Sequence, residues 1–166
     1  MKQIWAPWRM EYILNSKEPG CFMCDMFQAD DDCSNLLLYR GNTCAILMNR
    51  YPYNNGHLMV APYRHIDSME ALEEREMTEL MTLTVKAVSV LKTAIKPEGF
   101  NIGINLGSIA GAGLKDHIHM HIVPRWGGDT NFMPVLADVK VVPQHLMDLM
   151  RVLKELFINE SPEVNP

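Results

Sequence analysis

The sequence lacks any apolar run of the roughly 18 to 20 residues that a membrane-spanning helix requires. Residues 1–8 also lack the continuous apolar stretch of a secretory signal peptide, so we expect a cytoplasmic protein. Basic charge is not in excess: 15 Lys and Arg residues stand against 20 Asp and Glu residues, a formal net charge of −5. Duplex nucleic acid is bound mainly through basic surfaces, and this balance argues against such a partner. A small anionic ligand, held by a local cluster of donors, remains compatible with it.

Cysteine is scarce, with 4 residues in a chain of 166. Cys21 and Cys24 form a Cys-x-x-Cys pair, which in a reducing compartment indicates a metal site or a redox motif rather than a disulfide framework. Two thiols do not complete a tetrahedral site, so a reduced pair without metal is the alternative. Cys44 lies in an apolar run and is expected in the core, whereas Cys33 lies in a polar stretch and receives no role.

Short apolar and alternating runs predict β-strands, and turn signals separate the first three of them. The predicted strands are 36–40, 43–49, 58–62, 100–106 and 118–123. Because the early strands are joined by short turns, we expect an antiparallel meander of about five strands. The sequence shows no internal repeat and no linker. Residues 1–166 are therefore predicted to form a single domain whose tail frays from about residue 158.

Two helices are predicted beside the strands. The longer covers 68–95, begins at a cap provided by Asp67 or Ser68, and is closed by Pro97. The second helix follows Pro143, and its apolar face is expected to comprise Leu146, Leu149, Met150, Leu153 and Phe157. A long helix inserted between antiparallel strands covers one face of the sheet, which predicts an α+β fold.

Three of the 6 histidines alternate with apolar residues in Asp116-His-Ile-His-Met-His-Ile-Val-Pro124. Strand side chains alternate between faces, so we expect His117, His119 and His121 together on the exposed face. At about 3.3 Å per residue the outer two lie roughly 13 Å apart, so one metal ion could not easily bind all three without distorting the strand, and a polyphosphate chain fits better. The alternatives are ordinary surface histidines and a trihistidine metal site, for which no carboxylate base is evident.

This run matches the signature His-φ-His-φ-His-φ-φ, with φ an apolar residue, and the chain thereby resembles the histidine triad (HIT) superfamily. The segment Asn49-Arg-Tyr-Pro-Tyr-Asn-Asn-Gly-His-Leu-Met-Val-Ala-Pro62 is similar to the family's Asn-x-x-Pro…Gly-His-φ-φ-φ-x-Pro segment. The opening Trp5-Ala-Pro-Trp-Arg9 and the later segment 124–134 most resemble the diadenosine tetraphosphate hydrolase and phosphorylase branch. The resemblance spans most of the chain, and it implies a HIT-like α+β fold.

The resemblance implies a role for each histidine. His119 would be the nucleophile that attacks the α-phosphorus and forms a nucleotidyl-histidine intermediate, for which a neutral imidazole needs no strong base. His121 would donate a hydrogen bond or a proton to the departing phosphate, and His117 completes the catalytic set. Asn49 would hold the ribose hydroxyls. The substrate-binding set implied in this way is Asn49, Asn105, Gly107, Ser108, Gly113, His121 and Trp126.

One departure from the family pattern concerns the phosphate contacts. Many members place Gln followed by Ser or Thr before the triad, where this chain has the glycine-rich stretch 110–116. The contacts would come instead from backbone N–H groups of that turn, from Ser108 or from Lys115. Trp126, just past the triad, could stack on a base or cover a dimer seam.

Zinc-bearing members of the superfamily resemble the chain at the Cys-x-x-Cys pair. The resemblance implies a structural zinc ion with the ligands Cys21, Cys24, His65 and His117. Such a closed site would tie the N-terminal segment to the strand that carries His119. His57 is the rival for the fourth position.

The resemblance predicts an enzyme that cleaves dinucleoside polyphosphates such as diadenosine tetraphosphate at the α-phosphate. Water would be the acceptor in a hydrolase, and inorganic phosphate in a phosphorylase. A nucleoside phosphoramidase or a nucleotidylyltransferase is the alternative within the superfamily; sugar-phosphate transferases carry Gln at the position of His121. A nucleotide-binding regulatory protein with little turnover is the alternative from another class. The family also implies a homodimer with a continuous sheet.

Overall fold

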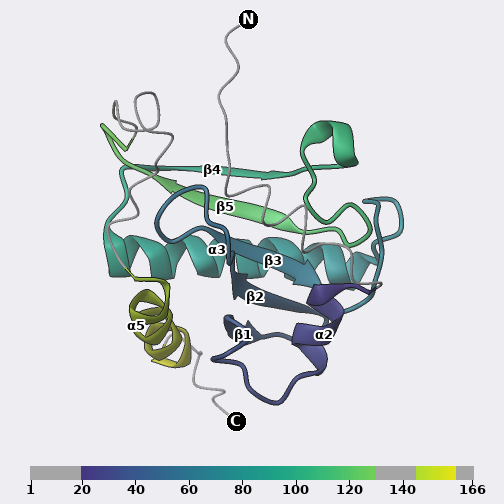
Figure 1. Ribbon diagram of the computed structural model, residues 1–166, viewed down its shortest axis with the longest axis horizontal. Helices are drawn as coiled ribbons and strands as arrows, with labels where there is room; N and C mark the ends of the chain where they lie inside the picture. Colours follow the sequence, from purple (N-terminus) through teal and green to yellow (C-terminus); the bar gives the residue numbers. More distant parts are fainter. Residues whose placement is uncertain (1–19, 130–144, 160–166) are drawn as a thin grey trace, which may run out of the picture.

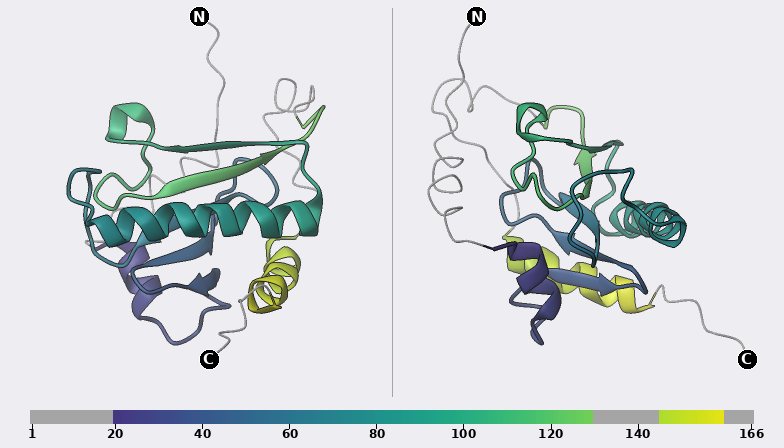
Figure 2. Two further views of the ribbon diagram at one scale, coloured as in Figure 1. Left: turned by 180° about the vertical axis from the view of Figure 1, so that it is seen from behind. Right: turned by 90° about the vertical axis from the view of Figure 1, so that its right-hand side faces the viewer.

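The computed structural model describes residues 20–129 and 145–159. Its strands are β1 (Leu37–Arg40), β2 (Cys44–Met48), β3 (Leu58–Pro62), β4 (Gly99–Ile104) and β5 (Met120–Arg125). Its α-helices are α2 (Phe22–Gln28), α3 (Glu74–Ile95) and α5 (Leu146–Asn159), and a short 3₁₀ helix, η1, covers Ser108–Ala110. The elements form the predicted α+β architecture, with α3 lying across one face of the sheet (Figures 1 and 2). No helix within the described ranges is both long and apolar enough to span a bilayer.

The five strands pair antiparallel throughout in the order β1-β2-β3-β5-β4. The predicted meander is therefore wrong at its second half, because β5 lies between β3 and β4. The chain leaves β3, runs through the 22 residues of α3 and returns at the sheet edge as β4. β5 then turns back into the gap and pairs with both neighbours. Local turn signals could not fix this order, since the long helix separates the strands concerned.

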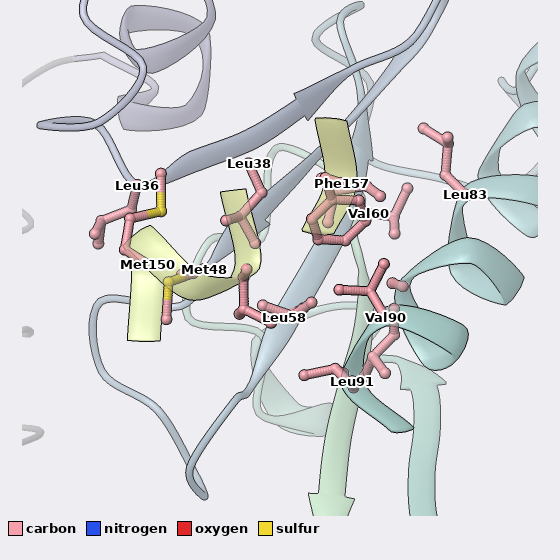
Figure 3. Packing of buried hydrophobic residues seen from close by; sticks show 14 of the residues in the cluster. Leu36, Leu38, Met48, Leu58, Val60, Leu83, Val90, Leu91, Met150 and Phe157 are labelled. Carbon is pink, nitrogen blue, oxygen red and sulfur yellow. The ribbon is translucent and has the colours of Figure 1, made fainter. Parts of the chain in front are cut away.

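Alternate residues of the central strands face two different apolar layers, as strand geometry requires. The larger layer packs β1, β2, β3 and β5 against α3 and α5 (Figure 3). Its fully buried side chains include Leu38, Ile46, Met48, Leu58, Leu91, Ile122, Leu149, Met150 and Phe157. The face of α5 seen here is the predicted one. Leu47, Met59 and Ala61 point the other way and pack against Cys21 and Met23 at the start of α2.

Helix α3 begins at Glu74, several residues after the predicted start near Asp67 or Ser68. The cap is Glu73, whose backbone N–H donates to the carboxylate of Glu76 at 2.8 Å. That carboxylate also accepts two hydrogen bonds from Arg64, at 2.6 and 2.7 Å. The helix start is thus set by an ion pair with a residue outside the helix, which helical spacing does not reveal. The helix ends at Ile95, as predicted.

The remaining differences are small or lie outside the described ranges. Each of the first four strands is observed within one or two residues of its predicted bounds. The short helix α2 was not predicted, because a seven-residue element offers only two turns of periodicity. The motif at 5–9, the second half of the segment 124–134 and the tail from residue 160 lie outside the described residues.

Candidate active site and metal centre

The three alternating histidines do not share one strand face. β5 begins at Met120, so His117 and His119 precede the strand and only His121 belongs to it. The predicted strand start at 118 is wrong because this part of the chain does not pair with β4: the backbone N–H of Ile118 donates to the carbonyl of Ile66 at 2.7 Å. The three side chains are also buried rather than exposed, at 0%, 5% and 8% of their possible surface. His117 meets the cysteines, whereas His119 and His121 face a cavity.

The cavity has a volume of about 340 Å³. It borders the smaller apolar layer, the one that packs against α2, and shares Leu47 and Met59 with it. About half of its lining residues are apolar, and the loop between β2 and β3 together with the glycine-rich stretch before the triad supplies most of the others. The lining residues are Phe22, Met26, Leu47, Met48, Asn49, Arg50, Tyr51, Tyr53, Met59, Gly111, Gly113, Leu114, His119 and His121. An apolar pocket with a few convergent polar groups is the usual form of a small-molecule site.

The tautomer of His119 follows from one hydrogen bond. Its Nδ1 lies 2.8 Å from the backbone carbonyl oxygen of His117, and a carbonyl can only accept. Nδ1 therefore carries the proton, and Nε2 carries the lone pair. Burial lowers the pKa of His119 below its usual value, although the hydrogen bond to His117 opposes that shift. Near neutral pH the cavity thus contains an uncharged imidazole with a basic nitrogen available.

His121 is oriented by a second, fully buried histidine. The backbone N–H of Tyr53 donates to Nδ1 of His57 at 3.0 Å, which places the proton of His57 on Nε2. That Nε2 lies 3.0 Å from Nδ1 of His121, so Nδ1 of His121 accepts and its own proton sits on Nε2. Burial, with a smaller contribution from His119, lowers the pKa of His121 to about 4. His121 is therefore a neutral hydrogen-bond donor. The ring of Tyr53 lies tilted against those of both histidines, with centroid separations of 4.6 Å from His57 and 5.7 Å from His121.

The four predicted metal ligands lie together. The donor atoms of Cys21, Cys24, His65 and His117 all fall within 4.8 Å of one another. Nδ1 of His117 lies 3.2 Å from Sγ of Cys21 and 3.6 Å from Sγ of Cys24, and Nδ1 of His65 lies 3.5 Å from Sγ of Cys24. Metal–ligand bonds of roughly 2.0 to 2.3 Å in a tetrahedral zinc site separate the donor atoms by roughly 3.3 to 3.8 Å. Two sulfur and two nitrogen donors at this spacing fit such an ion.

Neighbouring groups orient the ligand atoms of the cluster and favour a bound cation. Nε2 of His117 lies 2.8 Å from the carbonyl oxygen of Pro62, which holds the proton on Nε2 and leaves Nδ1 facing the cysteines. Burial, together with the neighbouring thiol of Cys21, raises the pKa of Cys24 to about 11. A thiolate at this position therefore needs a nearby positive charge. His57, the rival ligand in the sequence, instead lies against His121, outside the metal cluster.

The other predicted substrate residues divide into two groups. Asn49 and Gly113 line the cavity with His121. Of the described residues, Asn105, Gly107, Ser108 and Trp126 lie outside its lining, so their roles stay predictions. Nε1 of Trp126 donates to the carbonyl of Lys96 at 3.2 Å, beyond the far end of β5.

Several cavity residues were missed from the sequence. Phe22 and Met26 belong to the unpredicted helix α2. Tyr51 and Tyr53 lie inside the Asn49–Pro62 motif. Their proximity to a histidine run some 70 residues later depends on the tertiary fold, which the sequence pattern does not reveal. His57 follows Gly56 in the segment similar to the family's, and it was considered only as a metal ligand, not as the partner of His121.

Comparison with known proteins places the chain among its relatives. A family model of the HIT domain matches residues 32–128. An AP-4-A phosphorylase of Mycobacterium tuberculosis is 41% identical over 162 residues, which cover 92% of this chain and 83% of the relative. An asymmetrical bis(5'-nucleosyl)-tetraphosphatase of Schizosaccharomyces pombe is 33% identical, over 56% of this chain and 50% of the relative.

Solved structures share the fold. A Zn-bound histidine triad family protein from Mycobacterium smegmatis superposes with a TM-score of 0.67 at 20% identity, covering 84% of this chain and 94% of that one. A histidine triad nucleotide-binding protein from Sulfolobus tokodaii gives a TM-score of 0.64 at 26% identity, covering 84% and 93%. With the family model matched over more than half of its length and a relative at 41% identity, the chain belongs to the histidine triad (HIT) family.

Proposed function

We propose that the protein cleaves dinucleoside polyphosphates of the diadenosine tetraphosphate type at the α-phosphate, with His119 as nucleophile. The names of its relatives support this substrate class: one is an AP-4-A phosphorylase and another a bis(5'-nucleosyl)-tetraphosphatase. The observation that carries the mechanism is the hydrogen bond from Nδ1 of His119 to the carbonyl of His117, 2.8 Å long. It leaves a neutral, buried imidazole whose Nε2 lone pair is available inside the cavity.

In the first step Nε2 of His119 bonds to the α-phosphorus, and the bond from that phosphorus to the bridging oxygen breaks. The departing nucleoside triphosphate takes the electron pair of that bond. Nε2–H of His121, fixed by the hydrogen bond from His57, is suited to donate to an oxygen that gains charge in this step. Because burial holds the pKa of His121 near 4, this group acts first as a hydrogen-bond donor rather than as a charged acid.

In the second step an acceptor displaces His119 from phosphorus. Water would give AMP, and inorganic phosphate would give ADP. Asn49, which lines the cavity, is proposed to bind the ribose, and Gly113 and its turn to offer backbone N–H groups to phosphate. The high identity to a phosphorylase over most of the chain favours phosphate as the acceptor.

We also propose that the cluster of Cys21, Cys24, His65 and His117 binds zinc. The donor set and its spacing support a closed structural site rather than a catalytic one, because four protein ligands leave no open position for substrate. When bound, the ion would supply the positive charge that two adjacent thiolates require.

A homodimer in the cytoplasm is the proposed state of the protein. β4 is an edge strand of the described sheet, and the exposed side chains of Ile102, Leu106 and Ile109 lie on it or just after it. An exposed apolar edge strand is suited to pairing with a second copy. Sedimentation analysis of the purified chain tests this directly: a monomer at micromolar concentration would refute it.

Product analysis tests the proposed reaction. The zinc-loaded protein is incubated with diadenosine tetraphosphate, with and without inorganic phosphate, beside His119→Ala. ADP plus ATP formed only with phosphate identifies a phosphorylase, and AMP plus ATP without it identifies a hydrolase. Absence of turnover by a folded wild-type protein that binds nucleotide would favour the second candidate, a nucleotide-binding regulator.

A further inference from the structure

Helix α2 presents metal ligands and cavity residues on opposite faces. At about 100° per residue, Cys24 lies roughly 60° around the helix axis from Cys21, which is the helix N-cap, so their sulfur atoms reach the same cluster. Phe22 and Met26 are four residues apart, lie within roughly 40° of each other and line the cavity. The two pairs are thus separated by roughly 150° around the axis. One short helix connects the metal cluster to the apolar wall of the cavity.

Apolar packing of Cys21 and Met23 against β2 and β3 holds the first turn of the helix, and the metal cluster is its main polar contact. The helix is seven residues long, has no side-chain hydrogen bond at its N-cap, and buries one helical side chain fully, that of Met23. An isolated helix of this length is unstable in water. Its carboxyl end is anchored by Arg40, which donates to the carbonyls of Phe27 and Ala29 at 2.8 and 3.0 Å. At its amino end, the polar side-chain contacts among the described residues are those of the two cysteines with the histidines.

The phosphate side of the cavity has anchors that do not involve the metal. His117 keeps its hydrogen bond to Pro62, and the backbone of Ile118 keeps its bond to Ile66. His121 is held by His57. Loss of the metal should therefore increase the mobility of α2, which forms one wall of the cavity, more than it displaces His119 and His121.

We propose that the metal centre controls the affinity for the nucleoside base, because it clamps the helix whose residue Phe22 forms the stacking wall of the cavity. This inference rests on the proposed function, which supplies the nucleotide. Phe22 is a large aromatic residue that is 41% exposed at the cavity, where a base can cover it. Met26, one turn later, adds a polarisable contact. Loss of the metal therefore weakens the binding of the base, while the binding of phosphate groups changes little.

The test compares two probes that report on the two ends of the cavity. Calorimetry measures the dissociation constant of AMP, which has a base, and of inorganic tripolyphosphate, which has none. Both are measured on the zinc-loaded full chain, on the same protein after chelation, and on Phe22→Ala. Cys33→Ser is the matched cysteine control, because Cys33 is exposed and lies outside the cluster. Hydrogen–deuterium exchange of residues 21–28 follows α2 independently of any ligand.

Chelation and Phe22→Ala are each expected to weaken AMP binding at least about tenfold, the scale of one base–aromatic stack. Tripolyphosphate binding should change less than about twofold, which is well below the tenfold that 1.4 kcal/mol represents. Exchange should rise in 21–28 on chelation and stay low in α3, and Cys33→Ser should behave as wild type.

Three results would overturn the proposal: unchanged AMP affinity after chelation, equal weakening of both probes, or normal AMP affinity in Phe22→Ala. If the zinc-loaded wild type binds neither probe, the proposed function fails as well, which distinguishes that outcome from the other three.

Discussion

Acidification should destabilise the protein through His121, and the magnitude follows from its pKa. The folded protein holds this pKa at about 4, mainly by burial, whereas an unfolded chain has a value of about 6.5. Below pH 6.5 His121 binds a proton in the unfolded state but stays neutral in the folded state until the pH approaches 4. The contribution of His121 is therefore complete above pH 6.5 and is lost as the pH falls toward 4. Between pH 7 and pH 5 this one group should lower the free energy of unfolding by about 2 kcal/mol.

Urea denaturation of the zinc-loaded wild type and of His121→Gln at these two pH values isolates the effect. Gln can still accept a hydrogen bond from His57 but does not titrate, and the metal ligands are the same in both proteins. The wild type should lose about 2 kcal/mol more than the variant on acidification. Equal losses would refute the reasoning, because they would mean that His121 titrates in the folded protein near its unfolded value. His121 would then be charged under mildly acidic conditions and could act as a proton donor.

Substitutions at three further residues test other parts of the structure. His57→Leu removes the donor that fixes the tautomer of His121 and should lower kcat by about one to two orders of magnitude in steady-state assays, with His57→Gln retaining more activity. Glu76→Gln weakens the cap of α3 and the bond to Arg64, and should cost about 1 to 2 kcal/mol in urea denaturation; no change would show that solvent replaces both contacts. Phe157→Ala leaves a cavity under α5 and should cost about 3 to 5 kcal/mol, measured by thermal unfolding.

Local patterns in the sequence predicted most of the secondary-structure elements, and the family resemblance predicted the metal ligands. Strands with strong apolar runs, such as β2 and β3, and the amphipathic face of α5 were located because burial requires those patterns. The four metal ligands, suggested by family resemblance, lie together in the structure. Chemical type and spacing were sufficient for the strands and the helix, whereas the ligand set required the family resemblance.

Features that depend on distant contacts could not be read in the same way. The position of β5 between β3 and β4 depends on how α3 crosses the sheet. His117 faces the metal cluster and His119 faces the cavity because the backbone at Ile118 bonds to Ile66 rather than to β4. The apolar wall at Phe22 depends on α2, which is too short for its periodicity to stand out.

The central claim, that His119 attacks the α-phosphorus, is tested most directly by trapping the intermediate. The zinc-loaded protein is mixed with diadenosine tetraphosphate without inorganic phosphate, quenched within milliseconds in alkaline denaturant, and examined by intact-mass and peptide mass spectrometry. We expect an adduct of one AMP moiety on His119, removed by adding phosphate before the quench and missing from His119→Ala. An adduct on another residue, or full turnover by His119→Ala, would contradict the account.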